Sequence, residues 1–207
     1  MKKFLIVSLL LLAASAPRAE ELQTLHQKTL YAIGLSLGEE TRAYELTPSE
    51  RPYVLMGLED AFKGKPKVKL ADHAAKLDLL KQERWHKTFL DADKIKGVAK
   101  PSGLIYKEVR AGTGPSPKSP TDRVRAHYHG TFTDGKVFDS SVARWSPFVA
   151  PLNRVIKCWT EGMQLMKAGG KARLTCPADI AYGEQGRGDI PGGATLIFDV
   201  ELLAVNP

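Results

Sequence analysis

The stretch 124–203 constrains the fold more than any other part of the chain. Segments rich in β-branched and aromatic residues, which are typical of strands, are separated there and just upstream by turns. We predict strands over 104–106, 124–128, 171–175 and 195–203, and one short helix over 160–167. Strands with a single helix, and without regular βα alternation, indicate an α+β fold with an antiparallel sheet.

The part of the chain before Gly97 is helical in pattern. Apolar residues recur at three- and four-residue steps from Leu22 to Leu37, and Gly38 could end this first helix. Ser49 is a candidate cap for a second helix, which Gly64 would end. A third amphipathic segment covers 71–96; if wholly helical, it would be ~39 Å long.

Gly, Pro and Ser residues at 97–103 mark a boundary between the two patterns. We therefore expect a helical domain over 20–70, a connecting helix over 71–97 and a separate domain over 98–207. Three amphipathic helices make a thin core, so we expect residues 20–70 to bury their apolar stripes in a homodimer. The alternative is a monomer in which the helices fold back onto the second domain.

Residues 1–19 are typical of a secretory signal peptide, with Lys2 and Lys3, an apolar run over 4–14 and small residues over 13–16. The remaining chain has no other apolar run of membrane length, so no membrane span is expected. We therefore expect a periplasmic or secreted protein. Removing the leader leaves 27 basic and 23 acidic residues, mixed along the chain, which argues against a nucleic-acid partner.

Five ordered motifs in the carboxy-terminal half carry a family resemblance. They are H-Y-H-G at 127–130, D-G-K-V-F-D-S-S at 134–141, V-I-K-C-W-T-E-G at 155–162, A-D-I-A-Y-G at 178–183 and P-G-G-A-T-L-I-F-D-V-E-L-L at 191–203. Residues 98–207 resemble the FKBP-type peptidyl-prolyl isomerases, which bind tacrolimus and rapamycin. Two short motifs before residue 65 resemble the helical arm of the macrophage infectivity potentiator subfamily.

The resemblance implies an apolar pocket in a half-barrel sheet wrapped on one short helix. Its catalytic side chains would be Tyr128, Phe138, Asp139, Tyr182 and Phe198. Its substrate-binding residues would be Phe148, Val155, Ile156, Trp159 and Ile190. The family pattern is broken at Ala150, at Ile180 and in a shortened connection over 152–155, which bears on substrate preference and macrolide affinity.

Such a pocket can catalyse rotation without covalent chemistry or a cofactor. Peptide resonance sets a rotational barrier of ~18–20 kcal/mol, and the twisted transition state is less polar than the planar bond. An apolar aromatic pocket therefore favours the twisted state. The implied activity is X-Pro isomerisation in unfolded exported proteins, with chaperone activity; the alternative is a chaperone that binds proline segments without catalysis. Macrolides would be inhibitors.

Several residues leave alternatives open. Asp139 is the one charge that we expect at the pocket; it could orient Tyr128, face the rotating carbonyl, or cap the next turn. His127 and His129 are expected on a solvated strand face, because two histidines make a poor zinc site. The glycine-rich stretch 183–193 lacks the lysine of a phosphate loop.

The two cysteines also leave two readings open. The resemblance places Cys158 and Cys176 close together behind the pocket, so we expect a disulfide in the exported protein. The alternative is two buried free thiols.

Overall fold

The computed structural model describes residues 22 and 24–207. The predicted signal peptide over 1–19 lies outside the described residues. The chain divides into two compact units, residues 1–42 and residues 43–207. In the described part, no helix is long and apolar enough to cross a membrane.

Helix α1 (Leu25–Thr41) belongs to the first unit. It begins at Thr24, whose hydroxyl accepts from the Gln27 N–H while the Gln27 side chain accepts from the Thr24 N–H. This capping box satisfies two of the N–H groups that a helix start leaves free. The helix continues through Gly38, so the predicted stop at that glycine is wrong; Thr41 closes the last turn by donating to the Gly38 carbonyl.

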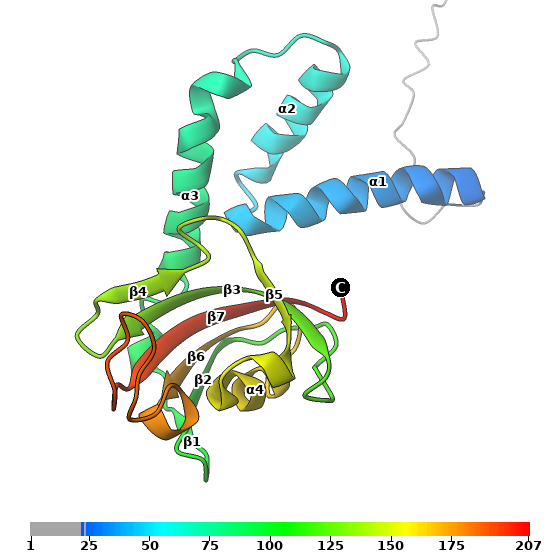
Figure 1. The fold of residues 1–207 in the computed structure, drawn as a ribbon. Helices are drawn as coiled ribbons and strands as arrows, with labels where there is room; N and C mark the ends of the chain where they lie inside the picture. Colours follow the sequence, from blue (N-terminus) through cyan, green and yellow to red (C-terminus); the bar gives the residue numbers. More distant parts are fainter. Residues whose placement is uncertain (1–21, 23) are drawn as a thin grey trace, which may run out of the picture. The chain divides into compact units, whose positions relative to one another are not determined.

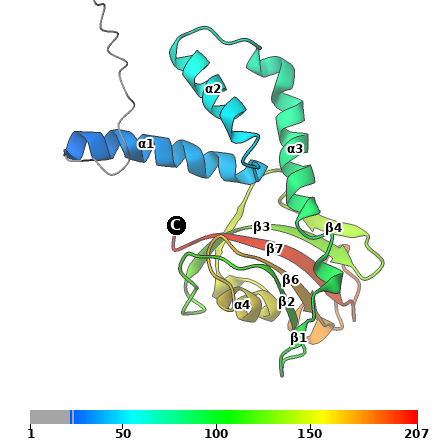
Figure 2. The same cartoon turned by 180° about the vertical axis from the view of Figure 1, so that it is seen from behind.

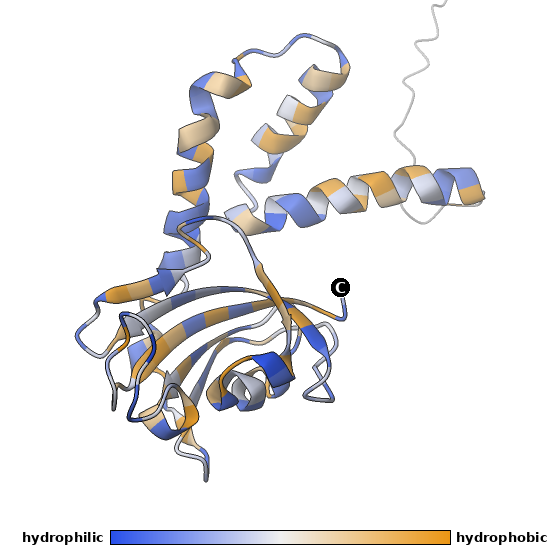
Figure 3. Ribbon diagram, viewed as in Figure 1, coloured by the Kyte–Doolittle hydropathy of each residue, from blue (hydrophilic) through white to orange (hydrophobic). Residues whose placement is uncertain are grey.

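The second unit begins with two helices, α2 (Arg51–Phe62) and α3 (Ala74–Lys87). The cap of α2 is Glu50 rather than the predicted Ser49, and its carboxylate accepts from the Thr47 N–H at 2.8 Å. An ion pair of 2.5 Å joins Glu50 to Arg84 of α3. Figure 3 shows polar and apolar residues interleaved along both helices.

Residues 71–97 do not form one continuous helix. The 3₁₀ turns Leu70–His73 and Ala92–Lys94 flank α3, and a third such turn, Arg42–Tyr44, precedes α2. Helix α3 ends at Lys87, where the chain turns so that Phe89 and Ala92 become buried. The ~39 Å length expected for a single helix therefore does not apply.

Seven antiparallel strands form one curved sheet that wraps around helix α4 (Lys157–Gln164), as Figure 1 shows. The strand order is β1-β2-β6-β7-β3-β4, and β5 pairs with β3. The strands are β1 (Val98–Ala99), β2 (Ile105–Arg110), β3 (Arg123–Phe132), β4 (Val137–Ser140), β5 (Phe148–Pro151), β6 (Lys171–Cys176) and β7 (Leu196–Val205). The predicted α+β class with an antiparallel sheet is confirmed.

Sequence patterns identified four of the strands and misplaced the short helix by three residues. The helix starts after Ile156, because the backbone from Leu152 to Arg154 forms a 3₁₀ turn that leads directly into it. Thr160, expected at the start, lies inside the helix and donates its hydroxyl proton to the Leu152 carbonyl at 2.6 Å. The short strands β1, β4 and β5 were not predicted.

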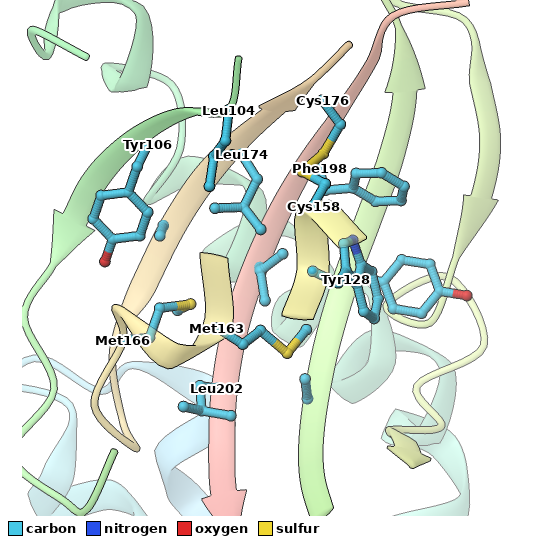
Figure 4. Packing of buried hydrophobic residues seen from close by; sticks show 14 of the residues in the cluster. Leu104, Tyr106, Tyr128, Cys158, Met163, Met166, Leu174, Cys176, Phe198 and Leu202 are labelled. Carbon is cyan, nitrogen blue, oxygen red and sulfur yellow. A yellow bond between two sulfur atoms is a disulfide. The ribbon is translucent and has the colours of Figure 1, made fainter. Parts of the chain in front are cut away.

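The main hydrophobic core lies between α4 and the concave face of the sheet (Figure 4). Leu174, Leu196 and Leu202 of the sheet region and Met163 of α4 are fully buried in this core. The structure contains the predicted disulfide between Cys158 and Cys176, with the two Cα atoms 5.8 Å apart. It ties the first turn of α4 to the end of β6.

A second, smaller core lies on the other face of the sheet, where the end of α3 packs (Figure 2). It consists of Trp85, Phe89, Ala92 and Val142, all of which are at most 3% exposed. Part of the apolar stripe of α3 is therefore covered within the same chain.

A buried lysine joins this second core to the sheet. Lys171 of β6 is 1% exposed, and its Nζ lies 2.6 Å from Glu45 and 3.7 Å from Glu201. The same ammonium lies 5.5 Å from the Trp85 ring centroid, within cation–π range. Burial alone would raise the pKa of Glu45, but the hydrogen bond and charge of Lys171 together lower it.

Candidate functional site

A pocket of about 760 Å³ opens at one end of the space between α4 and the sheet. All ten residues that the resemblance implied as catalytic or substrate-binding line it: Tyr128, Phe138, Asp139, Phe148, Val155, Ile156, Trp159, Tyr182, Ile190 and Phe198. They come from β3, β4, β5, the start of α4, the loop after β6 and β7. Residues up to 70 positions apart in the chain thus converge on one concave site.

Trp159 lies at the centre of the aromatic lining. Its ring centroid is 5.0 Å from Tyr128, 5.5 Å from Phe148 and 5.2 Å from Phe198, with interplanar angles of 74–85°. Edge-to-face contacts of this kind are favourable and fix the rings relative to one another. Figure 4 shows Phe198 and Tyr128 projecting from neighbouring strands on the side where α4 lies.

Phe138 reaches the pocket because of a glycine on the neighbouring strand. A Cβ atom at Gly130 of β3 would lie only 2.6 Å from the Phe138 ring. Any larger residue there would push this ring out of its place against Phe198, at a centroid distance of 5.4 Å. The H-Y-H-G motif therefore supplies both the pocket tyrosine and the space for Phe138.

The polar part of the pocket is a network of three side chains. The Tyr128 hydroxyl donates to Oδ2 of Asp139, and Oδ1 of Asp139 accepts from Arg144 at 2.7 Å and from the Ser140 N–H at 2.8 Å. The carboxylate thus orients Tyr128 and also holds the following turn, so two of the three roles left open are present together. Arg144 was not identified from the sequence, because an arginine in a loop has no periodic pattern.

The pKa values follow from this network. Burial and the hydrogen bond to Asp139 raise the pKa of Tyr128 to about 12, so it remains protonated. Burial alone would raise the pKa of Asp139, but the hydrogen bonds from Tyr128 and Arg144 and the charge of Arg144 lower it. At neutral pH the site therefore contains a neutral tyrosine and a carboxylate compensated by a guanidinium group.

The sequence indicated that Asp139 is the one charge at the pocket, and this prediction is wrong. Arg154, Arg187 and Asp189 also line it, all three of them exposed. The Arg187 guanidinium lies 5.8 Å from the centroid of the Tyr182 ring. The prediction failed because Arg154 lies in a 3₁₀ turn and Arg187 in a loop. In such segments neither a motif nor periodicity indicates which way a side chain points.

The expected solvated face for the two histidines is wrong. His127 is 4% exposed and its ring lies 4.7 Å from that of Trp145, while half-buried His129 lies 4.7 Å from His86 of α3. Strand alternation correctly placed them opposite Tyr128, but α3 covers that face. Among residues 22 and 24–207, no three His, Cys, Asp or Glu residues are grouped to hold a metal ion.

Fold and pocket together are those of a prolyl isomerase. Residues 114–203 match the family model described as FKBP-type peptidyl-prolyl cis-trans isomerase. Together with the relatives below, this shows that the chain belongs to the FKBP-type peptidyl-prolyl cis-trans isomerases and is an enzyme of that activity.

Three similar proteins match this chain over most of its length. The chain is 40% identical to the FKBP-type isomerase FkpA of Aeromonas hydrophila, over 93% of its own length and 81% of the relative's. It is 37% identical to the 22 kDa FKBP-type isomerase of Escherichia coli, over 88% and 96% of the two lengths. The crystal structure of FkpA from Escherichia coli matches with a TM-score of 0.53 and 34% identity, covering 90% of this chain and 99% of that one.

Proposed function

We propose that the enzyme acts on X-Pro bonds in unfolded, exported polypeptides by holding the prolyl ring over Trp159 in the aromatic pocket. The observation that carries this proposal is the convergence of Tyr128, Phe148, Trp159 and Phe198 around one open cavity. A prolyl ring is apolar and compact, so this lining binds it by excluding water. The X-Pro carbonyl then lies at the pocket mouth, where rotation takes place.

Two donors at the mouth are free to bind a substrate carbonyl. Tyr128 gives its single hydroxyl proton to Asp139, so it is not the donor. Within the described residues, neither the Tyr182 hydroxyl nor the Ile156 N–H donates to a protein acceptor, and both residues line the pocket. We assign these two groups to the substrate carbonyls, and Asp139 with Arg144 to positioning Tyr128.

Catalysis here requires only modest transition-state stabilisation. Uncatalysed exchange takes tens to hundreds of seconds, so a turnover of ~10 s⁻¹ needs roughly three decades, or ~4 kcal/mol. Loss of polarity in the twisted bond and one or two hydrogen bonds that strengthen on twisting are of that size.

The experiment is an isomerisation assay on a leucyl-prolyl peptide. We expect Tyr182→Phe, which removes one donor, to lower kcat/KM by up to ~10-fold. The matched control is Tyr53→Phe on α2, an exposed tyrosine outside the pocket. Tacrolimus, expected to occupy the same pocket, should inhibit the wild type. The assigned site would be contradicted if Tyr182→Phe were as active as the wild type and tacrolimus did not inhibit the wild type.

An oxidising compartment outside the cytoplasm is the proposed location. The disulfide between Cys158 and Cys176 supports it, since such bonds persist where thiols are not kept reduced. The predicted signal peptide over 1–19 supports it too. Fractionation that recovers the chain in the cytoplasm with its leader intact would contradict this part of the proposal.

The helical region supports a second role, as a dimeric chaperone built on residues 20–70. Apolar side chains remain exposed on both helices: Leu30, Tyr31, Ile33 and Leu35 on α1, and Tyr53, Leu55, Met56 and Phe62 on α2. Surfaces of this kind mark self-association or client binding. Two pockets on one dimer would grip two segments of a client and raise avidity.

Light scattering tests the dimer. The mature chain should have twice the mass of one chain. The fragment 43–207, which lacks α1 but keeps Glu45 beside Lys171, should be monomeric and should lose aggregation suppression while keeping peptide isomerisation. A monomeric mature chain at micromolar concentration would leave the back-folded alternative.

A further inference from the structure

The rim of the pocket carries an unbalanced positive charge. Four charged residues line the cavity, and the inner one, Asp139, is compensated by Arg144 at 2.7 Å. This leaves two guanidinium groups, Arg154 and Arg187, against one carboxylate, Asp189. Within the described residues, none of these three makes an ion pair. The rim therefore presents a net positive charge to whatever enters the pocket.

Both arginines stand on backbone that the fold holds in place. The N–H of Arg187 donates to the Ile190 carbonyl at 2.9 Å, and the Ile190 N–H donates back at 3.0 Å, which closes a tight turn at the pocket edge. Arg154 ends the 3₁₀ turn Leu152–Arg154, whose backbone is anchored by a 3.0 Å bond from the Leu152 N–H to the Asp122 carbonyl. The hydrogen-bonded backbone segments of Arg154 and Arg187 thus hold two positive charges at the cavity from separate parts of the chain.

Neither guanidinium makes a contact that would give it a purely structural role. Arg154 makes no side-chain hydrogen bond among the described residues, and the ring contact that Arg187 makes is with Tyr182, itself a pocket residue. Exposed arginines with free donors suit carboxylate recognition, because the planar group can bind both oxygens.

We propose that this rim selects the substrate: X-Pro segments with an acidic residue beside the proline are turned over faster than those with a basic one. The proposal rests on the proposed function, in which the pocket holds the prolyl ring. Residues next to the proline lie ~3.8 Å away along the chain, so their side chains lie beside the pocket that holds the prolyl ring. At a separation of ~8 Å and in the dielectric of water, one unit of net rim charge changes the rate by ~2.4-fold, so glutamyl and lysyl substrates should differ by ~6-fold.

The test uses three pentapeptides, Ala-X-Pro-Ala-Phe with X as Glu, Gln or Lys, and a leucyl-prolyl reference. Exchange rates are measured by two-dimensional exchange NMR on the mature protein, which avoids a coupling protease. At low ionic strength we expect the order Glu, Gln, Lys in kcat/KM. Because the Debye length falls to about 3 Å at 1 M salt, the Glu-to-Lys ratio should then approach one.

Charge variants locate the effect. The double variant Arg154→Gln with Arg187→Gln leaves Asp189 alone at the rim, so the Glu-to-Lys ratio should fall below one. The matched control is Arg123→Gln, an exposed arginine on β3 that does not line the cavity, which should leave the ratio unchanged.

The outcomes separate this inference from the proposed function. A wild-type enzyme that turns over the leucyl peptide but treats Glu and Lys peptides alike at low salt overturns the rim selectivity alone. Inactivity toward all peptides, the leucyl one included, contradicts the proposed function. Because the salt series needs only the wild type, the inference is decided even where a variant fails to fold.

Discussion

Trp85→Ala tests whether α3 is an integral part of the isomerase unit. The indole is 1% exposed, lies 4.6 Å from Phe89 between ring centroids, and has the Lys171 ammonium 5.5 Å from its centroid. Phe89 lies in the turn after α3 and Lys171 in β6, so the Trp85 side chain links the end of the helix to the sheet.

The magnitude follows from what the truncation removes and what it relieves. Replacing a fully buried Trp or Phe by Ala typically costs 3–5 kcal/mol through lost burial and an unfilled cavity. Losing the cation–π contact with a buried lysine adds to this. Against it, Trp85 Nε1 is buried without a hydrogen-bond partner in the described part, and removing that group recovers some desolvation cost. We expect a net loss of ~3 kcal/mol, a large part of the 5–15 kcal/mol of a typical domain.

The assay is urea unfolding followed by circular dichroism at 25 °C. The matched control is Leu79→Ala, which removes a 64% exposed apolar side chain from the same helix and should change the unfolding free energy by under ~0.5 kcal/mol. Activity per folded molecule should stay close to wild type, because Trp85 does not line the pocket. A loss below ~1 kcal/mol for Trp85→Ala would refute the packing of α3 on the sheet.

Three further predictions concern the pocket and the face behind it. Burial and nearby positive charges lower the pKa of His127 to about 4, so as pH falls below the unfolded value of ~6.5 the unfolded state binds a proton that the folded state does not. Urea titrations should therefore show stability lost between about pH 6.5 and 4, by ~2 kcal/mol at pH 5, and His127→Gln should remove that part; an identical pH profile would contradict it. Arg144→Met should lower kcat/KM and raise the pH below which activity is lost, because Asp139 loses the charge that lowers its pKa; an unchanged acid limb in a pH–rate profile would count against this. Reducing the bond between Cys158 and Cys176 should lower the unfolding free energy by ~3 kcal/mol for a loop of 18 residues, and two alkylatable thiols in protein purified from an oxidising compartment would refute the bridge.

The pocket could be predicted from the sequence because its residues fall in motifs with fixed spacing. Phe138 and Asp139 follow a D-G turn, and Trp159 follows the Val155-Ile156 pair, so the resemblance carried each of them to one position. What it could not supply was contact between side chains. Arg144 completes the Tyr128 network from an irregular loop, and nothing in its neighbours distinguishes it from any other surface arginine.

The helical half was harder to predict because an amphipathic stripe does not say what covers it. The pattern containing Trp85 and Phe89 correctly indicated a buried side, but the covering surface is the sheet of the same chain. For the same reason His127, a polar residue on an alternate strand position, was expected on a solvated face. His127 is instead buried with its ring against Trp145, and strand periodicity cannot report such a contact.

Both faces of strand β3 carry residues that the enzyme needs, and this limits where its chain can be joined to that of another protein. One face supplies Tyr128 to the pocket, while the other presents His127 and His129 to the second core. A chimera that exchanges the helical region between family members, in evolution or by engineering, therefore cannot be joined at Gly97, the glycine before β1. A functional chimera has to keep residues 74–92 with the isomerase domain, or supply another apolar segment that covers the face of β3 opposite the pocket.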